Sequence, residues 1–270
     1  MSPNQSRAKK TRPEQVVILC GGQGTRMREE TEFRPKALVE IGGRPVLWHL
    51  MRIYDHFGYR RFVLCLGYRG SMIKEYFLDY HWRNHDFTLQ LGKEAPSVRT
   101  ISEQVEEWEI VFADTGLHTQ TGGRLHRVQK YLDGDRFLAN YCDGLSDVDL
   151  DALVAFHSAH GKIATLTGFH PRSRFGLVRV DDSGVINYWQ EKPLMNDLTS
   201  GGFFVFEKHL FDYLDPECVL ELGPFEQLAR DRQMALYQHA GFWQSMDTFK
   251  EAQALDSIWN KGGAPWKVWE

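Results

Sequence analysis

The sequence predicts an α/β fold whose core is a doubly wound, mostly parallel sheet that carries an antiparallel β insertion. The apolar run Val16–Leu19 has the length and composition of a strand buried on both faces, and a glycine-rich turn follows it. Strand and helix patterns then alternate up to about residue 80, which is the order that parallel strands with crossover helices require. Over residues 81–112 polar and apolar residues alternate instead, which is typical of antiparallel strands.

The glycine-rich turn is the segment with the clearest chemistry. Three glycines within residues 21–24 let the backbone turn sharply and leave its N–H groups exposed. Exposed N–H groups of this kind bind anions, and Thr25, Arg26 and Lys36 would add a hydroxyl and two cations. A polyphosphate is the ligand that suits this set of groups best.

Two better-known phosphate-binding loops do not match. The P-loop needs a lysine after its last glycine, where this chain has Thr25. The dinucleotide fingerprint needs a third glycine, where this chain has Met27, and this disfavours an NAD-linked dehydrogenase. Because a glycine-rich turn alone is weak evidence, the later Pro35-Lys36 carries much of the case for a phosphate site.

Charge, apolar runs and cysteines narrow the class of protein. The 270-residue chain has 32 basic and 36 acidic residues, so no broad cationic field favours nucleic acid as a partner. The apolar run 16–19 is too short for a signal peptide or a membrane span. The four cysteines are widely spaced with no CxxC pair, which predicts free thiols and a cytoplasmic location. Residues 1–13 are expected to form a flexible N-terminal extension.

Two strand–helix units follow the glycine-rich turn. A helix is expected over Pro45–Phe57, because proline suits a first helical turn and Gly58 provides a stop. Phe62–Leu66 has the character of a second buried strand, and a helix is expected over about Ser71–Tyr80. His49, in the first helix, is expected to be structural, since no carboxylate or cysteine lies near it at metal-ligand spacing.

The rest of the chain predicts further strands and helices. Phe137–Cys142 resembles another buried strand, and Asp143 stands at its carboxyl end, where such sheets gather their ligands. A helix is expected to open at Thr119–Arg124 and to run to Tyr131. A second helix is expected to run through Ala159, with Asp147, Asp149 and Asp151 favouring its start. The other expected elements are a hairpin with strands at 174–180 and 185–190, and helices over Phe225–Arg232 and Phe249–Trp259. The C-terminal helix and tail, residues 245–270, are rich in tryptophan and are expected to pack on the body or on a neighbouring subunit.

Gly22-x-Gly24-x-Arg26 followed by Pro35-Lys36 resembles the signature of the sugar-phosphate nucleotidylyltransferases. Further blocks of the family pattern follow in order: Glu29–Thr31, Val39–Gly43, Thr121–Arg124, Glu191–Pro193, Gly201–Phe204, Gly241–Gln244, Met246–Thr248 and Ala264–Glu270. From about residue 15 to the C-terminus these blocks resemble the cytidylyltransferases of that family. The resemblance implies a Rossmann-like sheet of the nucleotide-diphospho-sugar transferase type and one nucleotidylyltransferase domain over residues 14–270.

The resemblance also implies a reaction and its partners. CTP would donate a cytidylyl group to a sugar 1-phosphate, with glucose 1-phosphate as the expected acceptor and Mg²⁺ as the cofactor. It further implies a homo-oligomer, with the insertion as a contact near the active site, and a role in polysaccharide or deoxysugar synthesis. Neither nucleic acid nor a membrane is expected as a partner. Another sugar 1-phosphate, another nucleotide such as GTP, and a catalytically silent nucleotide-sugar-binding protein remain open alternatives.

Residue roles follow from the positions that match the family pattern. Arg26 and Lys36 would be catalytic, and Asp143 and Asp247 would bind the metal, since two carboxylates with waters and phosphate oxygens suit Mg²⁺. The residues expected at the nucleotide are Leu19, Cys20, Gly21, Gly22, Gln23, Gly24, Thr25, Arg26, Lys36, Thr119, Gly123, Arg124 and Cys142, with Thr119 and Arg124 at the cytosine or its ribose. The residues expected at the sugar phosphate are Gly176, Glu191, Lys192, Ser200 and Gly201.

Some positions depart from the family pattern. Ser200 stands where the cytidylyltransferases have an asparagine that faces the sugar, and Cys142 stands where they have a glycine. His170 also lies where related sequences often have a smaller or apolar residue. Because Ser200 and His170 can alter hydroxyl recognition, the identity of the sugar stays open. Lys192 precedes Pro193, which predicts an extended backbone and a reproducibly aimed lysine side chain.

Overall fold

The computed structural model describes residues 12–27, 31–92, 97–101 and 106–270. Residues 1–11 of the predicted extension, the Glu29-Glu30 pair and parts of the predicted insertion lie outside the described residues. Arg12 and Pro13 pack on the folded domain. The Arg12 guanidinium lies 4.8 Å from the centroid of the Tyr59 ring, and Pro13 is buried.

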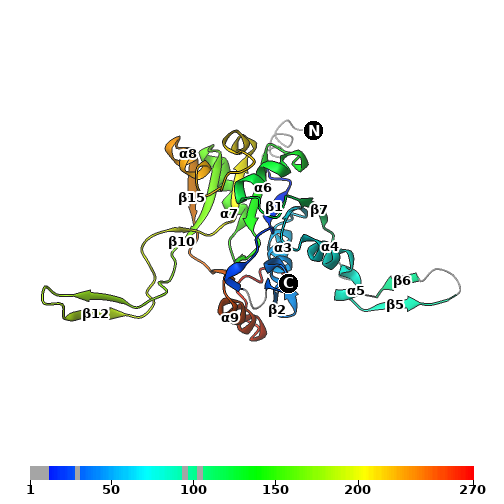
Figure 1. Ribbon diagram of the computed structural model, residues 1–270, viewed down its shortest axis with the longest axis horizontal. Helices are drawn as coiled ribbons and strands as arrows, with labels where there is room; N and C mark the ends of the chain where they lie inside the picture. Colours follow the sequence, from blue (N-terminus) through cyan, green and yellow to red (C-terminus); the bar gives the residue numbers. More distant parts are fainter. Residues whose placement is uncertain (1–11, 28–30, 93–96, 102–105) are drawn as a thin grey trace.

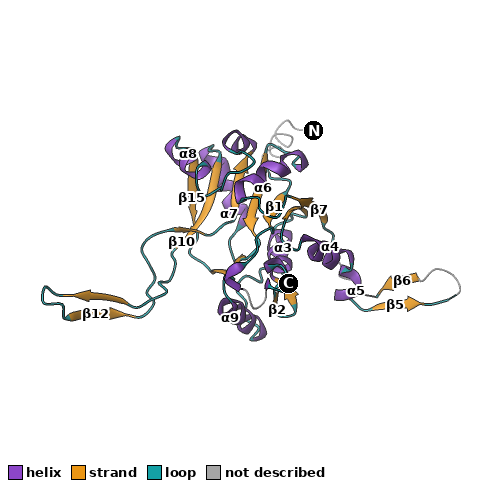
Figure 2. Cartoon of the chain, viewed as in Figure 1, coloured by secondary structure: helices purple, strands orange, loops and turns teal. Residues whose placement is uncertain are grey.

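A mixed, mostly parallel sheet forms the centre of the molecule (Figures 1 and 2). In spatial order its strands are β7 (Glu109–Asp114), β4 (Arg61–Leu66), β1 (Val16–Leu19), β8 (Arg136–Tyr141), β14 (Phe204–Glu207), β10 (Ala164–Phe169) and β15 (Met234–Gln238), and the short β13 (Thr199–Ser200) also pairs with β10. β1 is central and runs parallel to both β4 and β8, whereas β13 and β14 run antiparallel to their neighbours. The predicted fold class is confirmed.

Helices cover both faces of this sheet. Val16 and Ile18 of β1 belong to one apolar core, and Val17 and Leu19 belong to the other, because successive strand residues point to opposite faces. The first core is covered by α3 (Val46–His56), α4 (Gly70–Leu78), α7 (Leu150–His160) and α9 (Phe249–Asn260), and the second by α6 (Thr121–Val128), the 3-10 helix η4 (Lys208–Tyr213) and α8 (Pro224–Arg230). Burial on both faces explains why β1 is apolar throughout.

The tryptophan-rich C-terminus packs on α3. Trp266 is fully buried and Trp269 nearly so, and the rings of Trp269 and Trp48 meet edge to face with centroids 5.7 Å apart. His49 is fully buried among these rings and lies 2.8 Å from the Ile41 carbonyl through Nε2. The predictions that the tail packs on the body and that His49 is structural are therefore confirmed.

Two antiparallel hairpins project from opposite sides of the body (Figure 1). One consists of β11 (Leu177–Val180) and β12 (Ile186–Gln190), as the sequence predicts. The other consists of β5 (Phe87–Gln90) and β6 (Ser97–Thr100) and follows α5 (Tyr80–Asn84). The remaining short elements are β2 (Glu40–Ile41), β3 (Arg44–Pro45), β9 (Gly144–Ser146), β16 (Trp243–Ser245) and the 3-10 helices η1 (Thr25–Met27), η2 (Lys36–Leu38) and η3 (Gln129–Tyr131).

Several predicted boundaries are wrong. The insertion does not extend to residue 112, because β7 begins at Glu109 and runs parallel to β4 within the central sheet. Thr119 does not open α6, which begins at Thr121 with Gln120 as its N-cap and without a side-chain capping bond. β10 and β15 are buried or half-buried strands that the sequence pattern did not indicate.

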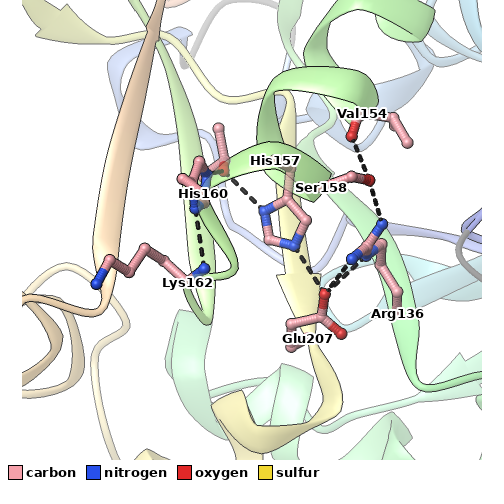
Figure 3. A network of polar contacts seen from close by, with 8 residues as sticks. Arg136, Val154, His157, Ser158, His160, Lys162 and Glu207 are labelled. Atoms are coloured by element: carbon pink, nitrogen blue, oxygen red, sulfur yellow. Dashed lines mark hydrogen bonds and ion pairs between the residues drawn. The ribbon is translucent and has the colours of Figure 1, made fainter.

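Figure 3 shows a polar cluster around Glu207. It lies at the opposite end of the sheet from the glycine-rich turn, because Arg136 begins β8, which runs parallel to β1. Glu207 Oε1 accepts hydrogen bonds from Arg136 Nε (2.8 Å) and contacts Nε2 of the buried His157 (3.0 Å). Burial alone would raise the pKa of Glu207, but the hydrogen bonds with His157 and Arg136 lower it overall. Arg136 begins β8 and Glu207 ends the antiparallel β14, so this cluster ties α7 to the amino end of β8 and has a structural role.

Candidate active site

The glycine-rich turn leaves β1 at the carboxyl edge of the sheet. Cys20 N donates to the Cys65 carbonyl (3.0 Å), so β1 stays paired with β4 up to the turn. Gly24 adopts a φ of +61°, and a Cβ atom there would lie 2.7 Å from Thr31 Cγ2. The Thr31 hydroxyl donates to the Gly24 carbonyl (2.9 Å). The shape of the turn therefore requires glycine at position 24.

A buried arginine ties the turn to the neighbouring strands. Arg124 donates to the carbonyls of Gly21 (3.1 Å) and Leu66 (3.0 Å). It also donates to the Thr115 hydroxyl (2.7 Å) and the Gly116 carbonyl (2.9 Å). A Cβ atom at Gly21 would lie 2.0 Å from Arg124 Nη1, so the guanidinium fits only beside glycine. Burial lowers the pKa of Arg124, but an arginine stays charged at neutral pH.

This geometry gives Arg124 a role that the sequence did not indicate. Its guanidinium hydrogen-bonds the backbone behind the turn and brings a positive charge next to the glycine-rich turn. Its predicted contact with cytosine or ribose stays a prediction.

A cleft of about 380 Å³ opens in front of the turn. Its lining includes many of the predicted nucleotide and metal residues: Leu19, Gly21, Gly22, Gly24, Thr25, Lys36, Thr119, Arg124, Cys142, Asp143 and Asp247. Gln120, Thr121 and Tyr141 also line it and were not predicted individually, although they adjoin the predicted blocks. Of the other predicted nucleotide residues, Cys20, Gln23 and Gly123 are not part of the described lining. The side chain of Arg26 lies outside the described part of the chain.

A lysine and two carboxylates converge at one side of the cleft. Lys36 Nζ donates to Asp247 Oδ1 (2.8 Å) and to Asp143 Oδ2. The three side chains are 12%, 26% and 23% exposed, so this contact is largely shielded from solvent. Burial alone would lower the pKa of Lys36, but Asp143 and then Asp247 raise it overall, so the lysine stays charged. Asp143 and Asp247 follow Lys36 by 107 and 211 positions along the chain, so the structure brings together three predicted residues that are distant in sequence.

A small two-stranded sheet brings the two aspartates together. β9 begins directly after Asp143, and β16 ends two residues before Asp247. The two strands pair antiparallel, with Ser245 opposite Gly144. Met246 N donates to the Asp143 carbonyl (2.9 Å), which continues the pairing up to the aspartates.

The carboxylate pair fits a divalent cation of the Mg²⁺ type. Its oxygens already converge on one cationic atom, Lys36 Nζ, and hard oxygen donors are the ligands that Mg²⁺ prefers. Within the part of the chain that the structure describes, no group of three or more histidine, cysteine, aspartate or glutamate side chains is arranged to hold a metal ion. Asp143 and Asp247 would therefore need water and substrate oxygens to complete a coordination shell.

The environment of Cys20, beside the cleft, favours the neutral thiol. All four cysteines are free, as predicted, and Cys20, Cys65 and Cys142 are buried. Burial, followed by the neighbouring Cys142, raises the pKa of Cys20 well above its usual value. A nucleophilic cysteine requires the thiolate, so this environment argues against covalent chemistry at Cys20.

One of the predicted sugar residues, Gly201, contacts the strand that leads to Asp247, and Ser200 precedes it in the chain. Ser200 ends β13 and pairs with Gly168 at the carboxyl end of β10. The Gly201 carbonyl accepts a hydrogen bond from Trp243 Nε1 (2.6 Å), and the Trp243 ring stacks on Phe169 with centroids 3.8 Å apart. A Cβ atom at Gly201 would lie 2.6 Å from Trp243 Nε1. Gly201 thus adjoins the strand that leads to Asp247, whereas Ser200 pairs with β10.

The other predicted sugar residues lie at the base of the β11–β12 hairpin, outside the cleft lining. Glu191 and Lys192 are more than half exposed and lie 3.7 Å apart, and Gly176 packs against Trp189. The predicted extended backbone at Lys192 is wrong, because its φ is +43°. A following proline favours extended backbone, so the left-handed conformation of Lys192 departs from its local preference and is imposed by the surrounding structure.

The fold and the cleft define a nucleotide-binding enzyme of the α/β class. A glycine-rich turn follows the central parallel strand, and a lysine and two carboxylates line the same cleft where such sheets hold their ligands. The chain belongs to the nucleotidyl transferase family, whose model matches residues 15–244.

Known relatives agree with this assignment and confirm the family resemblance. The chain is 43% identical over 256 residues to a probable glucose-1-phosphate cytidylyltransferase of Bacillus subtilis (strain 168), covering 94% of this chain and 99% of that protein. It is 43% identical over 258 residues to the glucose-1-phosphate cytidylyltransferase of Salmonella typhi, with the same coverage.

Solved structures support the fold independently. HddC from Yersinia pseudotuberculosis complexed with GMP-PN superposes with a TM-score of 0.65 at 19% identity, covering 91% of this chain and 99% of that one. A UDP-glucose pyrophosphorylase complexed with UDP-glucose superposes with a TM-score of 0.67 at 14% identity, covering 93% and 100%. In the described part of the chain, none of the helices has the length and apolar character needed to cross a membrane.

Proposed function

We propose that this chain transfers the cytidylyl group of CTP to glucose 1-phosphate, releasing pyrophosphate and forming CDP-glucose. The observation that carries the proposal is the convergence of Lys36, Asp143 and Asp247 beside the glycine-rich turn. The substrates are those named for relatives that match over 94% of the chain.

The chemistry needs no general base. A phosphate oxygen of the sugar 1-phosphate is already an adequate nucleophile, so it can attack the α-phosphorus of CTP in line while pyrophosphate leaves. The enzyme then has to align two anions and offset their repulsion. N–H groups of the turn and Arg26 would hold the β- and γ-phosphates. Lys36, which lines the same cleft, would pair with the α-phosphate and the incoming phosphate.

Mg²⁺ held by Asp143 and Asp247 would supply positive charge at the α-phosphate. The two carboxylates must release Lys36 for this, because a lysine between them and a divalent cation compete for the same oxygens. Lys36 would then be available to the phosphates. Lys36 would therefore pair with the two carboxylates before the metal binds and with the phosphates of the substrates afterwards.

The start of α6 would recognise the base. Thr119, Gln120 and Thr121 line the cleft, and the rest of this helix start is packed tightly against the loop over residues 216–220. A Cβ atom at Gly123 would lie 2.2 Å from the Pro216 carbonyl oxygen. This packing would hold the base-binding groups rigidly, and the choice of CTP rests on the relatives.

Glu191 and Lys192 would bind the acceptor, Lys192 its phosphate and Glu191 its hydroxyls. Because both lie outside the described lining of the cleft, the hairpin has to approach the cleft when the substrate binds, or a neighbouring subunit has to supply these side chains. We propose a homo-oligomer on the same grounds. The two projecting hairpins, β11–β12 and β5–β6, are called arms below. The β11–β12 arm exposes about 60% of the apolar residues Val185, Ile186 and Trp189, and the β5–β6 arm exposes 48% of Leu89. Apolar arms of this kind are normally covered by a partner.

The free cysteines suit a reducing cytoplasm, where we place the enzyme. The test of the reaction is pyrophosphate release from CTP, UTP, dTTP and GTP with glucose-, mannose-, heptose- and N-acetylglucosamine-1-phosphate, with Mg²⁺ present. The proposal predicts the highest kcat/KM for CTP with glucose 1-phosphate. A higher value for another sugar would point to Ser200 and His170 as the cause, and no turnover with any pair would indicate a nucleotide-sugar-binding protein.

A further inference from the structure

Asp247 lies on a short segment whose two ends are both held by other carboxylates. The segment Phe242–Thr248 contains β16 and leads into α9. At its start, Asp147 Oδ1 accepts a hydrogen bond from Phe242 N (2.7 Å). At its end, Glu251 Oε2 accepts hydrogen bonds from the backbone N–H groups of Asp247 (2.8 Å) and Thr248 (2.9 Å).

Asp147 therefore has a different role from the one that the sequence indicates. The start of α7 is capped by Asp149, which accepts a hydrogen bond from Ala152 N (2.9 Å). Asp147 instead faces the segment that carries Asp247, and its carboxylate also contacts His239 Nε2 (2.8 Å). Its backbone N–H donates to the Phe242 carbonyl (3.3 Å). Asp147 thus closes the far end of the β9–β16 ladder.

Glu251 holds the near end of the same segment. With Thr248 it forms a capping box, in which the Thr248 hydroxyl accepts a hydrogen bond from Glu251 N (3.3 Å) and the Glu251 carboxylate returns to Thr248 N. The additional bond to Asp247 N is not part of an ordinary capping box. It fixes the backbone of the very residue whose carboxylate meets Lys36.

We propose that Asp147 and Glu251 are positioning residues that hold Asp247 opposite Asp143, so that the two carboxylates are arranged for a divalent cation before substrate arrives. The proposal rests on the metal assignment made under the proposed function. Between the two anchors the segment is held by the three residue pairs of the β9–β16 ladder, by the bond from Met246 N to the Asp143 carbonyl, and by the bond from Trp243 Nε1 to the Gly201 carbonyl. Without the anchors the segment has to be ordered each time a metal binds, and this lowers the affinity of the site.

The test measures Mn²⁺ binding to the full chain without nucleotide, by calorimetry and by water-proton relaxation. Asp147→Ala and Glu251→Ala are expected to weaken Mn²⁺ binding about tenfold or more. Asp147→Asn and Glu251→Gln keep a carbonyl oxygen that accepts the same backbone hydrogen bonds, so they should bind within about twofold of the wild type. Asp149→Ala, which removes a carboxylate cap two residues away, is the matched control and should leave Mn²⁺ binding unchanged.

The outcomes separate position from charge and from general stability. If the alanine variants bind Mn²⁺ like the wild type, or the amide variants lose as much affinity as the alanine variants, the positioning role is refuted. A loss of affinity in Asp149→Ala that matches its loss of thermal stability would also refute it, because general destabilisation would then explain the effect. Asp247→Ala tests the metal assignment itself. If Asp247→Ala binds Mn²⁺ normally, the metal assignment and the positioning role are both refuted. If Asp247→Ala loses Mn²⁺ affinity but the Asp147 and Glu251 variants do not, the metal assignment stands and only the positioning role is refuted.

Discussion

The buried His49 predicts a loss of stability in mild acid. Nε2 lies 2.8 Å from the Ile41 carbonyl, so this nitrogen carries the proton, while Nδ1 accepts from the Trp266 indole N–H (3.4 Å). A second proton on Nδ1 would face an N–H donor inside an aromatic cluster. The pKa of His49 is lowered from 6.5 to about 4, mainly by burial and to a smaller extent by nearby Arg44, while the hydrogen bond with the Ile41 carbonyl opposes this shift.

The sign and size of the change in stability follow from the difference between the pKa of His49 in the folded and in the unfolded chain. Because the folded pKa lies below the unfolded pKa, the unfolded chain binds more protons between pH 6.5 and about 4, so stability falls as the pH falls through this range. For one such group the free energy of unfolding decreases by about 2 kcal/mol at pH 5 and about 3 kcal/mol at pH 4, relative to neutral pH.

Urea unfolding at neutral pH and at about pH 5 measures the effect for the wild type and for His49→Gln. Glutamine can donate to the Ile41 carbonyl but cannot be protonated, so the variant should lose about 2 kcal/mol less than the wild type between the two conditions. His56→Gln, at an exposed position of the same helix, is the control and should behave like the wild type. If the aromatic rings stabilised the imidazolium instead, the wild type would become more stable in acid relative to His49→Gln, and the reasoning would be refuted.

Three further predictions concern the cleft and the arms. Lys36→Met should lower kcat for pyrophosphate release by about 10²–10³-fold and raise KM for CTP far less, and unchanged turnover would exclude Lys36 from the chemistry. Gly24→Ala should destabilise the fold by about 1–2 kcal/mol and weaken CTP binding measured by calorimetry, because its positive φ and the nearby Thr31 methyl both disfavour a Cβ atom. Gly43→Ala shares the positive φ but has open space, so equal loss of CTP binding in both variants would contradict this account. Trp189→Glu should reduce the mass measured by light scattering whereas Asp182→Ala should not, and an oligomer that survives Trp189→Glu would exclude the β11–β12 arm from the contact.

The sequence predicts well those strands that are continuous apolar runs, because such runs indicate burial directly. β1 and β4 are apolar because both faces of the sheet are covered, so their runs indicate strands without further information. β10 is equally buried but contains two threonines and a glycine, so its sequence is not a continuous apolar run and does not predict a buried strand. The fold accepts Thr167 there because its hydroxyl donates to the Phe203 carbonyl (3.0 Å), a partner that no local pattern reveals.

The candidate site was predicted from matching family positions, and its long-range geometry was not. The resemblance indicates Asp143 and Asp247, but their separation along the chain conceals the β9–β16 ladder that brings them together. Arg124 illustrates the same limit. Its position within a family block suggests a ligand contact, whereas its hydrogen bonds to Gly21 and Leu66 depend on three strands ending at one edge. Local patterns specify elements, and tertiary contacts decide what each side chain does.

The contact between Lys36 and the two aspartates also gives a reason why, under the proposed function, one lysine and a divalent cation would share the same site. Two carboxylates that converge on one point repel each other unless a cation lies between them, and in this structure the cation is Lys36. A triphosphate bound in the cleft, as the proposed function requires, would give Lys36 a second anionic partner. Lys36 could move toward the phosphates only if another positive charge replaced it between Asp143 and Asp247. Under the proposed function, the carboxylate pair would make the catalytic position of Lys36 depend on a second cation, and this would couple the binding of metal to the binding of nucleotide.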